Sequence, residues 1–192
     1  SWPALSAALA AAAFVCTSVE FDRDGTVVGD PTEIALADLA ARTGTTATPA
    51  DRNAGRRLTY PFDPRLARMA TVDVDDHDGL RVHVKGAPEE LIGLCTSIAT
   101  STGARPMSST DHDAFAAQLE QWAKRGLRVL AVAEKTLPGP PPTSRSQAES
   151  ELTLLGLVAM VDPPRPEVAD AVERAHRAGI RIHVVTGDHA LT

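Results

Sequence analysis

The sequence predicts an α+β protein that carries a short α/β unit at its C-terminal end. Turn-forming residues at 22–25 and 76–79 each separate two strand-like segments, which indicates β-hairpins and therefore antiparallel pairing. Capped amphipathic segments lie between the strands and indicate helices. Residues 152–185 follow the order strand, helix, strand, which is typical of half a parallel α/β unit.

Length and composition narrow the class of protein. With 192 residues the chain can form one large or two small domains around a sizeable core. The net charge of -6, with no run of Lys or Arg, argues against nucleic acid as a partner. Cys16 and Cys95 are far apart and form no C-x-x-C pair, so we expect reduced, packed thiols rather than a disulfide or a zinc site.

The apolar run at residues 4–16 is too short to span a bilayer, and no basic segment precedes it. We therefore expect an alanine-rich helix over 3–13 instead of a membrane anchor or signal peptide. Because the chain opens inside this helix, the sequence suggests a piece of a longer protein. A strand over 14–21 should follow and pair with 26–28 across the first turn.

The next predicted helix begins with strong capping signals. Asp30 is a good N-cap, Pro31 suits the first helical position, and Glu33 completes a capping-box pattern, so capping is a sufficient local explanation for Glu33. Gly44 should end this helix after Arg42. Residues 45–57 are polar and predict a loop.

Two prolines shape the following segment. Pro61 and Pro64 restrict residues 58–69 to an edge or irregular stretch before a strand over 68–74, and Phe62 within it would by itself be a core residue. The acidic cluster at residues 73–78 invites a calcium-loop interpretation, but position twelve counted from Asp73 is Val84 instead of the required glutamate. A solvated hairpin turn is the better explanation.

The stretch from Lys85 to Glu90 organises the chain. A strand over 80–84 ends on Lys85, the backbone turns on Gly86 and Ala87 with little side-chain bulk, and a helix over 89–94 begins near Pro88. Such a turn lets a flat or anionic ligand approach the main chain beside a positive charge. Taken alone, the stretch is better explained by a surface lysine in a strand-to-helix connection.

The second half predicts further elements. Residues 100–110 are a polar loop, Asp111 caps a helix that ends at Gly126, and a buried strand covers 127–133. Arg128 in that strand requires either a carboxylate partner or a place at the mouth of a site. The proline-rich residues 137–150 predict an irregular linker, followed by a strand over 152–161, a helix from Pro166 to Gly179 and a strand over 180–185.

Four short motifs carry a resemblance to a known family. In order they are Gly29-Asp30-Pro31-Thr32-Glu33, Lys85-Gly86-Ala87-Pro88-Glu89, Asp162-Pro163-Pro164-Arg165 and Thr186-Gly187-Asp188. In this order they resemble the cation-transporting P-type ATPases, in particular the P2 group of calcium and sodium/potassium pumps. The resemblance implies that residues 1–161 are the nucleotide-binding domain, an antiparallel sheet flanked by helices. Residues 162–192 would then be part of the α/β phosphorylation domain.

The resemblance also implies a nucleotide site, matched position by position. Its members are Glu33 at the adenine amino group, Phe62 stacked on adenine, Lys85 lining the pocket, Gly86 and Ala87 as its floor, Leu130 as a wall, and Arg128 directed at the phosphates. The chain departs from the family at Ala67, where these pumps usually carry a lysine. Either Arg65 or Arg68 replaces that lysine, or nucleotide is held less tightly.

The catalytic centre is expected to be incomplete within this sequence. Thr186, Gly187 and Asp188 would lie near the transferred phosphate and Mg²⁺ in the intact pump, with Asp188 an indirect metal contact and Arg165 at the domain joint. The Asp-Lys-Thr-Gly-Thr motif that carries the phosphorylated aspartate is absent and would lie upstream of Ser1. The fragment should bind ATP on the cytoplasmic side of the membrane without forming a phosphoenzyme. Its partners would be the phosphorylation domain, the actuator domain and the transmembrane helices of the same pump.

Two other classes remain as alternatives. A phosphohydrolase of the haloacid-dehalogenase type is suggested by Thr186-Gly187-Asp188 together with the spacing of Asp22 and Asp24, although those two aspartates fall in a predicted turn. A non-enzymatic interaction module would have no nucleotide site at all. The transported ion is not encoded here, because its determinants would lie in membrane helices.

Overall fold

The fold is an α+β sandwich built on one mixed sheet, as seen in a computed structural model that describes residues 2–22, 24–45, 48–75, 79–161 and 166–185. Within these residues the sheet has seven strands in the order β3-β4-β5-β8-β9-β6-β7. All neighbours are antiparallel except β6 and β9. The strands are β3 (Arg56–Asp63), β4 (Arg68–Val74), β5 (Leu80–Gly86), β6 (Cys95–Thr100), β7 (Gly103–Pro106), β8 (Arg128–Leu137) and β9 (Leu152–Met160). The predicted fold class is confirmed.

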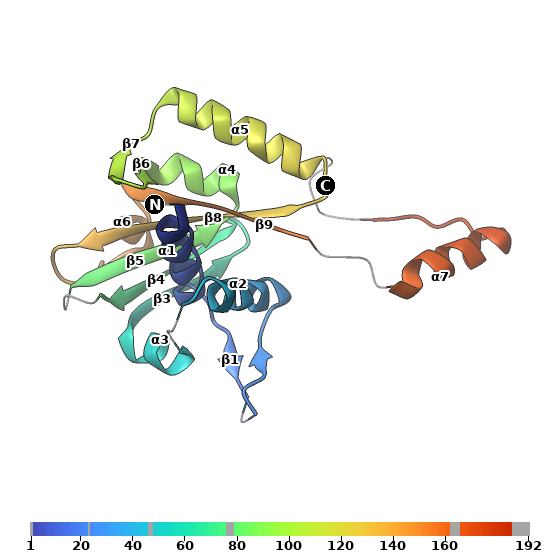
Figure 1. The fold of residues 1–192 in the computed structure, drawn as a ribbon, viewed down its shortest axis with the longest axis horizontal. Helices are drawn as coiled ribbons and strands as arrows, with labels where there is room; N and C mark the ends of the chain where they lie inside the picture. The colour runs from blue at the N-terminus through green and yellow to red at the C-terminus, as the bar shows by residue number, and fades with distance from the viewer. Residues whose placement is uncertain (1, 23, 46–47, 76–78, 162–165, 186–192) are drawn as a thin grey trace.

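Helices cover both faces of this sheet (Figure 1). They are α1 (Trp2–Val15), α2 (Pro31–Arg42), α3 (Pro49–Gly55), α4 (Pro88–Leu91), α5 (Ser109–Ala123), α6 (Arg145–Ala148) and α7 (Pro166–Arg177). The view in Figure 1 places α4 and α5 above the sheet and α2 and α3 below it, while α7 extends to the side. None of the helices in the described part of the chain combines the length and the apolar character needed to cross a bilayer.

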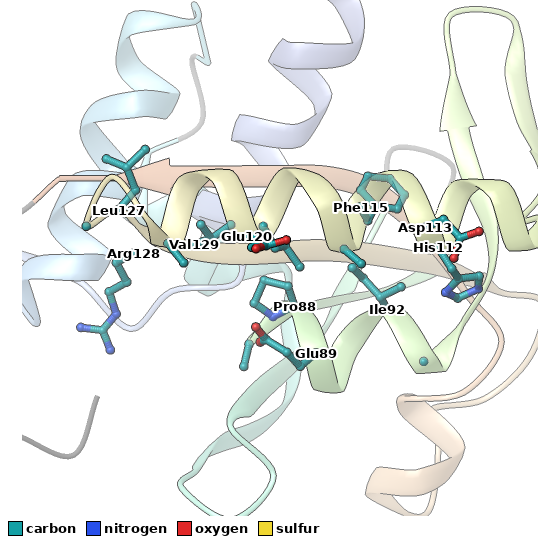
Figure 2. A pocket seen from close by; sticks show the side chains of 16 residues that line it. Pro88, Glu89, Ile92, His112, Asp113, Phe115, Glu120, Leu127, Arg128 and Val129 are labelled. Atoms are coloured by element: carbon teal, nitrogen blue, oxygen red, sulfur yellow. The ribbon is translucent and has the colours of Figure 1, made fainter. Parts of the chain in front are cut away.

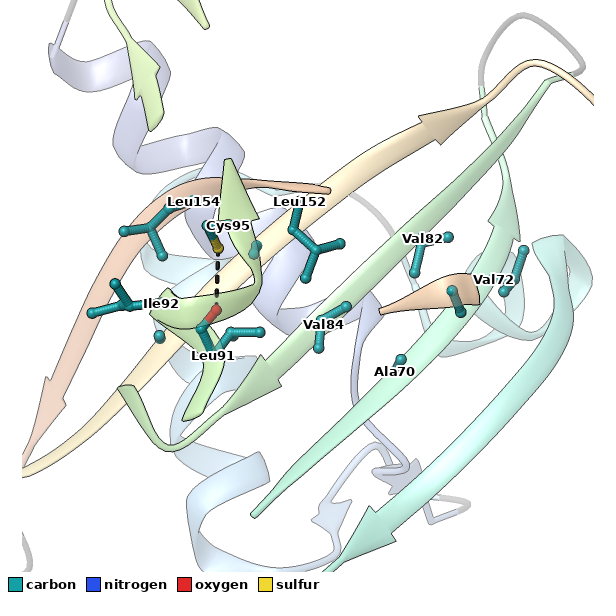
Figure 3. Close-up of a cluster of buried hydrophobic side chains, with 12 residues drawn as sticks. Ala70, Val72, Val82, Val84, Leu91, Ile92, Cys95, Leu152 and Leu154 are labelled. Carbon is teal, nitrogen blue, oxygen red and sulfur yellow. Dashed lines mark hydrogen bonds between the residues drawn. The ribbon is translucent and has the colours of Figure 1, made fainter. Parts of the chain in front are cut away.

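Strand periodicity explains why the two faces differ. On β4 and β5, small and branched apolar residues alternate with polar ones, so that one face is apolar and the other polar. The apolar face packs against α4, α5 and α6 and forms the core drawn in Figure 3, where the Cys95 thiol also donates to the Leu91 carbonyl over 3.3 Å. Its members on the two strands are Ala70, Val72, Val82 and Val84. The polar face turns toward α1, α2 and α3.

Several local predictions are confirmed. Asp30 caps α2 by accepting a hydrogen bond from the Thr32 amide, with Pro31 at the first helical position. β3 is an edge strand, as Pro61 within it requires. Strands β4 and β5 form the predicted hairpin, with Val74 opposite Leu80, although residues 76–78 at its tip lie outside the described residues. α7 begins at Pro166, and Gly179 adopts a positive φ of 73° after it.

The strand predicted over 14–21 is wrong. Helix α1 continues to Val15, and only Glu20–Phe21 (β1) forms a strand, which pairs with Val27–Val28 (β2) in a separate two-stranded ribbon. The reason is tertiary packing, because Phe14 lies one helical turn after Ala10 and both are buried against Ala37 of α2. A β-favouring residue is therefore kept helical by its neighbours.

Three segments predicted as loops or linkers also contain regular structure. Residues 45–57 contain α3, which is capped by a reciprocal Thr48–Asp51 capping box. Residues 100–110 contain β7, which turns back on β6 and pairs with it. The following helix is capped by Ser108, while Asp111 is the third helical residue of its capping box. The linker at 137–150 contains the short helix α6.

The strand predicted over 180–185 does not form. Val184 and Val185 are 85% and 96% exposed, and no described strand lies beside them. An isolated aliphatic segment has no partner for its backbone groups, so its β-propensity alone cannot create a strand. The parallel strand pair expected with it is likewise missing, since β9 pairs with β8 and β6 only among the described strands.

Candidate functional site

A row of side chains crosses the polar face of the sheet at the start of β4. Met69 lies opposite Lys85 on β5, which lies opposite Val132 on β8. On β3 the register jumps from the pair Tyr60–Ala70 to the pair Asp63–Arg68, so two residues of β3 oppose Met69 alone. These are Pro61 and Phe62, in a β-bulge. The bulge therefore brings Phe62 into one row with Lys85.

The centre of this row is a buried ion pair. Lys85 is 6% exposed, and its Nζ donates to Glu33 Oε1 over 2.6 Å. The second carboxylate oxygen of Glu33 accepts the Ser18 amide N–H over 3.1 Å. Glu33 thus does not cap its own helix, as its position in α2 suggested, because Lys85 offers a charged partner that outcompetes the neutral amide of the first turn.

The backbone beside Lys85 is packed so closely that only glycine fits at position 86. A Cβ placed on Gly86 would lie 2.4 Å from Arg68 Cβ and 2.6 Å from the Ala67 carbonyl oxygen. The Ala87 amide donates to that same carbonyl over 2.9 Å. Gly86 and Ala87 therefore tie the end of β5 to the turn before β4.

Phe62 is the aromatic member of the row, and it is largely exposed to solvent. It is 59% exposed, in contrast to the core position that a lone phenylalanine suggests. Pro61 cannot donate to the ladder, and the bulge interrupts the pairing of this edge strand with β4. An exposed aromatic face is a suitable surface for a planar ligand.

The two arginines considered as substitutes for lysine lie in different environments. Arg68 faces the side of the sheet opposite to Lys85, and its Nε donates to the buried Glu149 carboxylate over 2.7 Å. Arg145 donates to the same carboxylate over 2.7 Å and to the Arg68 carbonyl. Arg65 is 91% exposed at its side chain and lies 3.6 Å from Asp63. Ala67 between them has a positive φ of 48°.

Leu130 and Arg128 enter the site from β8. Leu130 packs, partly buried, with Leu36 of α2 and Val132. Arg128 is the first residue of β8, and its side chain is exposed and points away from α5 (Figure 2). Within the described ranges Arg128 does not form the salt bridge to a carboxylate that was one of its two predicted roles. The other predicted role, a place at the mouth of a site, remains.

A separate groove lies away from Lys85. It holds about 840 Å³ beneath α5, on the apolar side of the sheet, and shares only Ala87 and Arg128 with the predicted nucleotide residues (Figure 2). We place the candidate site at Lys85 and Glu33 because the groove beneath α5 is lined mainly by apolar residues and lacks a buried charged pair. Phe115, Leu119 and Ile92 are typical of its walls.

A second polar cluster continues from Lys85 along the same face. Asp73 accepts hydrogen bonds from Arg56, Thr71 and His83. Burial by itself would raise the pKa of Asp73, but the hydrogen bonds from His83 and Arg56 outweigh it and hold the pKa below its ordinary value. Cys16 lies among these residues, and burial raises its pKa to about 11. Sequence reasoning missed this cluster, whose only signal is polar alternation on two strands.

The remaining predicted residues fall into two groups. Thr186, Gly187, Asp188 and Arg165 lie outside the described residues. Asp22 and Asp24 lie in the turn of the β1–β2 ribbon, where the Asp24 carboxylate accepts the Thr26 amide and thus serves the turn. Within the described ranges no group of three or more His, Cys, Asp or Glu residues could hold a metal ion.

Comparison with known proteins identifies the family. Residues 5–167 match the family model described as P-type ATPase, cytoplasmic domain N, and the chain therefore belongs to the P-type ATPases. It is 40% identical to the cation-transporting ATPase pma1 of Synechocystis over 170 residues, which cover 88% of this chain and 18% of the relative. It is 39% identical over 175 residues to the sodium/potassium exporting P-type ATPase cta3 of Schizosaccharomyces pombe, with 86% and 16% covered.

A bacterial calcium pump is a further relative. The chain is 32% identical to calcium-transporting ATPase 1 of Lactococcus lactis over 179 residues, which cover 93% of this chain and 20% of the relative. The chain thus spans about a fifth of the length of these relatives or less. The predicted resemblance to the cation-transporting P-type ATPases is confirmed.

Proposed function

We propose that this chain is the ATP-binding part of a cation-transporting P-type ATPase and presents ATP to an aspartate outside residues 1–192. The observation that carries the proposal is the row on the polar face, in which the exposed Phe62 of β3 and the Lys85–Glu33 ion pair are separated by Met69 of β4. Residues 1–161 would be the nucleotide-binding domain, and residues 162–192 part of the phosphorylation domain. The chain would act on the cytoplasmic side of the cell membrane, together with the actuator domain and transmembrane helices of the same pump.

Each side chain of the row has chemistry that suits adenine nucleotide. Phe62 offers a π-face for the base, and Glu33 offers carboxylate oxygens for its amino group. Lys85 supplies a positive charge, while Gly86 lets the strand that carries Lys85 pack closely against the turn at Ala67 and Arg68. Leu130 completes an apolar wall, and Arg128 can reach toward the phosphates.

Of the two arginines that could replace the usual lysine at Ala67, Arg65 is the better candidate. Arg68 already donates to Glu149 on the other side of the sheet, and releasing it would leave a buried carboxylate with one partner fewer. Arg65 is bound only weakly to Asp63 at an exposed position. We therefore propose that Arg65, and not Arg68, contacts the phosphates.

Magnesium would reach the site with the phosphates of ATP, since divalent cations bridge phosphate oxygens in phosphoryl transfer. Asp188, with Thr186 and Gly187, would contribute to this metal and phosphate site only in the intact pump, and Arg165 would lie at the joint between the two domains.

The proposal predicts selective binding of Mg-ATP. We expect a dissociation constant on the order of 0.1 to 1 mM, or about 4 to 5.5 kcal/mol, because the phosphates lack their partner domain. In an NMR titration, amides near Glu33, Phe62 and Lys85 should shift with ATP and respond less to GTP. Lys85→Ala and Phe62→Ala should each weaken binding about tenfold.

Matched exposed residues provide the controls. Lys124 is an exposed lysine directly after α5, and Phe21 is an exposed phenylalanine on β1, so Lys124→Ala and Phe21→Ala should leave ATP affinity unchanged. The proposal fails if millimolar Mg-ATP shifts no amide of the row. It also fails if the control substitutions weaken binding as much as those at Lys85 and Phe62, because the site would then lie elsewhere.

A further inference from the structure

Outside the proposed site, Arg52 is the most deeply buried arginine of the described residues. It comes from α3, a segment predicted as a loop, and is 6% exposed. Its guanidinium donates to Thr17 Oγ1 over 2.9 Å and to the Val19 carbonyl over 2.6 Å. It also donates to Asn53 Oδ1 and lies 5.8 Å from the centre of the Phe14 ring.

These contacts hold the charge of Arg52 without an ion pair. None of the carboxylates in the described part of the chain lies within ion-pair distance of its guanidinium. Burying a guanidinium costs free energy unless its donors are satisfied, and here Nε and both terminal nitrogens have acceptors. Such a network is rigid, because releasing any one acceptor would leave a buried charge poorly solvated.

The two long-range acceptors of Arg52 flank a single residue. Thr17 and Val19 are both fully buried, and Ser18 between them belongs to the irregular connection from α1 to β1, where no helix or sheet ladder holds the backbone. The position of the Ser18 amide therefore depends on its two anchored neighbours. That amide donates to Glu33 Oε2, while Oε1 of the same carboxylate accepts from Lys85.

We propose that Arg52 is a positioning residue of the nucleotide site: by fixing Thr17 and Val19 it aims the Ser18 amide at Glu33 and so orients the Glu33–Lys85 pair. The inference rests on the proposed function, since it assigns the pair a ligand. A fixed carboxylate presents its acceptors in one direction, whereas a carboxylate held only by a flexible lysine can rotate. Arg52 thus acts on the ligand through two intermediate contacts.

The test compares Arg52→Met with Arg57→Met. Arg57 is exposed on β3 and bonds only to nearby carbonyls of its own segment, so its substitution removes the same charge without touching residues 17–19. Two milder variants guard against loss of folding. Thr17→Val removes one acceptor of Arg52 with little change in shape, and Arg52→Lys keeps the charge but cannot reach both acceptors in a fixed fork.

Two measurements separate positioning from general stability. The first is hydrogen exchange of the Ser18 amide, with the Val84 amide of β5 as an internal reference. The second is the dissociation constant of Mg-ATP. We expect Arg52→Met to speed exchange at Ser18 about tenfold relative to Val84 and to weaken ATP binding about tenfold. Thr17→Val and Arg52→Lys should change both quantities in the same direction but by less.

The outcomes distinguish this inference from the proposed function. If the unsubstituted chain binds ATP and Arg52→Met binds it equally well, the inference is overturned and the proposed function stands. Equal acceleration of Ser18 and Val84 also overturns it, because Arg52 would then only stabilise the fold. If the unsubstituted chain binds no ATP, the proposed function itself is overturned. Should Arg52→Met not fold, unchanged Ser18 exchange and ATP affinity in Thr17→Val would overturn the inference.

Discussion

The geometry around Lys85 depends on a few close atomic contacts. The absent side chain of Gly86 allows β5 to approach the turn at Ala67 and Arg68, and the Ala87 amide closes that contact. Glu33 is held by one contact to Lys85 and one to Ser18, so its orientation depends on two segments outside α2.

Substitution of Gly86 tests this close approach. Gly86→Ala places a methyl group 2.4 Å from Arg68 Cβ and 2.6 Å from the Ala67 carbonyl, and both atoms belong to the backbone or its first side-chain carbon. We expect a loss of about 1 to 3 kcal/mol in the free energy of unfolding, measured by urea denaturation. Gly93→Ala is the control, because nothing lies within 4 Å of its added Cβ. Equal stability of both variants would contradict the expected clash.

The two thiols should be inert in the folded protein. Burial raises the pKa of Cys16 to about 11 and that of Cys95 to about 12, so neither forms thiolate at neutral pH, and both side chains are buried. We expect no reaction with a disulfide reagent at pH 8 in native buffer and two equivalents after unfolding in denaturant, in agreement with the two cysteines of the chain. Fast reaction of one native thiol would show that its surroundings open readily.

Among the secondary-structure elements, the short helix α3 positions one side chain that the site depends on. α3 has seven residues, too few to be stable alone, yet it delivers Arg52 to the connection between α1 and β1. Its capping box at Thr48 and Asp51 satisfies two backbone amides of the first turn. The bulge in β3 plays a comparable part for Phe62.

Removal of the cap should therefore weaken α3. Thr48→Ala eliminates the hydroxyl that accepts the Asp51 amide, and we expect a loss of about 1 kcal/mol in the free energy of unfolding. Thr48→Ser keeps the hydroxyl and should retain most of the stability. The free energies of unfolding are measured by urea denaturation. Equal stability of the alanine and serine variants would contradict the role of the Thr48 hydroxyl as a cap.

For the whole molecule, the buried charges on the polar face link stability to pH. Because the folded pKa of Asp73 lies below its unfolded value, its ionised form stabilises the protein above the unfolded pKa of about 4. This contribution is lost as the pH falls through the folded pKa. The protein should therefore become less stable in acid, as Asp73 gains a proton and weakens its bonds to Arg56 and His83.

Comparison with Asp73→Asn isolates this contribution from that of other carboxylates. Asparagine resembles protonated aspartate, so the difference in unfolding free energy between the two proteins should be largest at pH 7 and shrink as the pH falls below about 4. The exposed Asp38 provides the control, since Asp38→Asn should give a small difference at every pH. A difference for Asp73→Asn that stays constant from pH 7 to about 3 would contradict the prediction.

Sequence alone predicted the α+β class, the caps of α2, the edge character of β3, the β4–β5 hairpin and membership of the P-type ATPases. These features depend on residues close together in the chain, such as Asp30 with Pro31, or on ordered short motifs. Sequence reasoning placed the end of α1 wrongly and missed α3, α6 and β7. Phe14 shows why: its β-propensity is overridden by packing of α1 on α2.

Only the tertiary structure decided how charges meet. Lys85 and Glu33 are 52 residues apart in sequence, and Arg68 and Glu149 are 81 apart. Their pairing depends on the order of strands in the sheet and on which face each residue occupies. Local pattern carries no information on either, because a strand of period two can be paired with any neighbour. The sequence motifs identified Glu33 and Lys85 as members of the candidate site. The strand order and register of the sheet determined that Glu33 pairs with Lys85 and that Arg68 lies on the opposite face from Lys85.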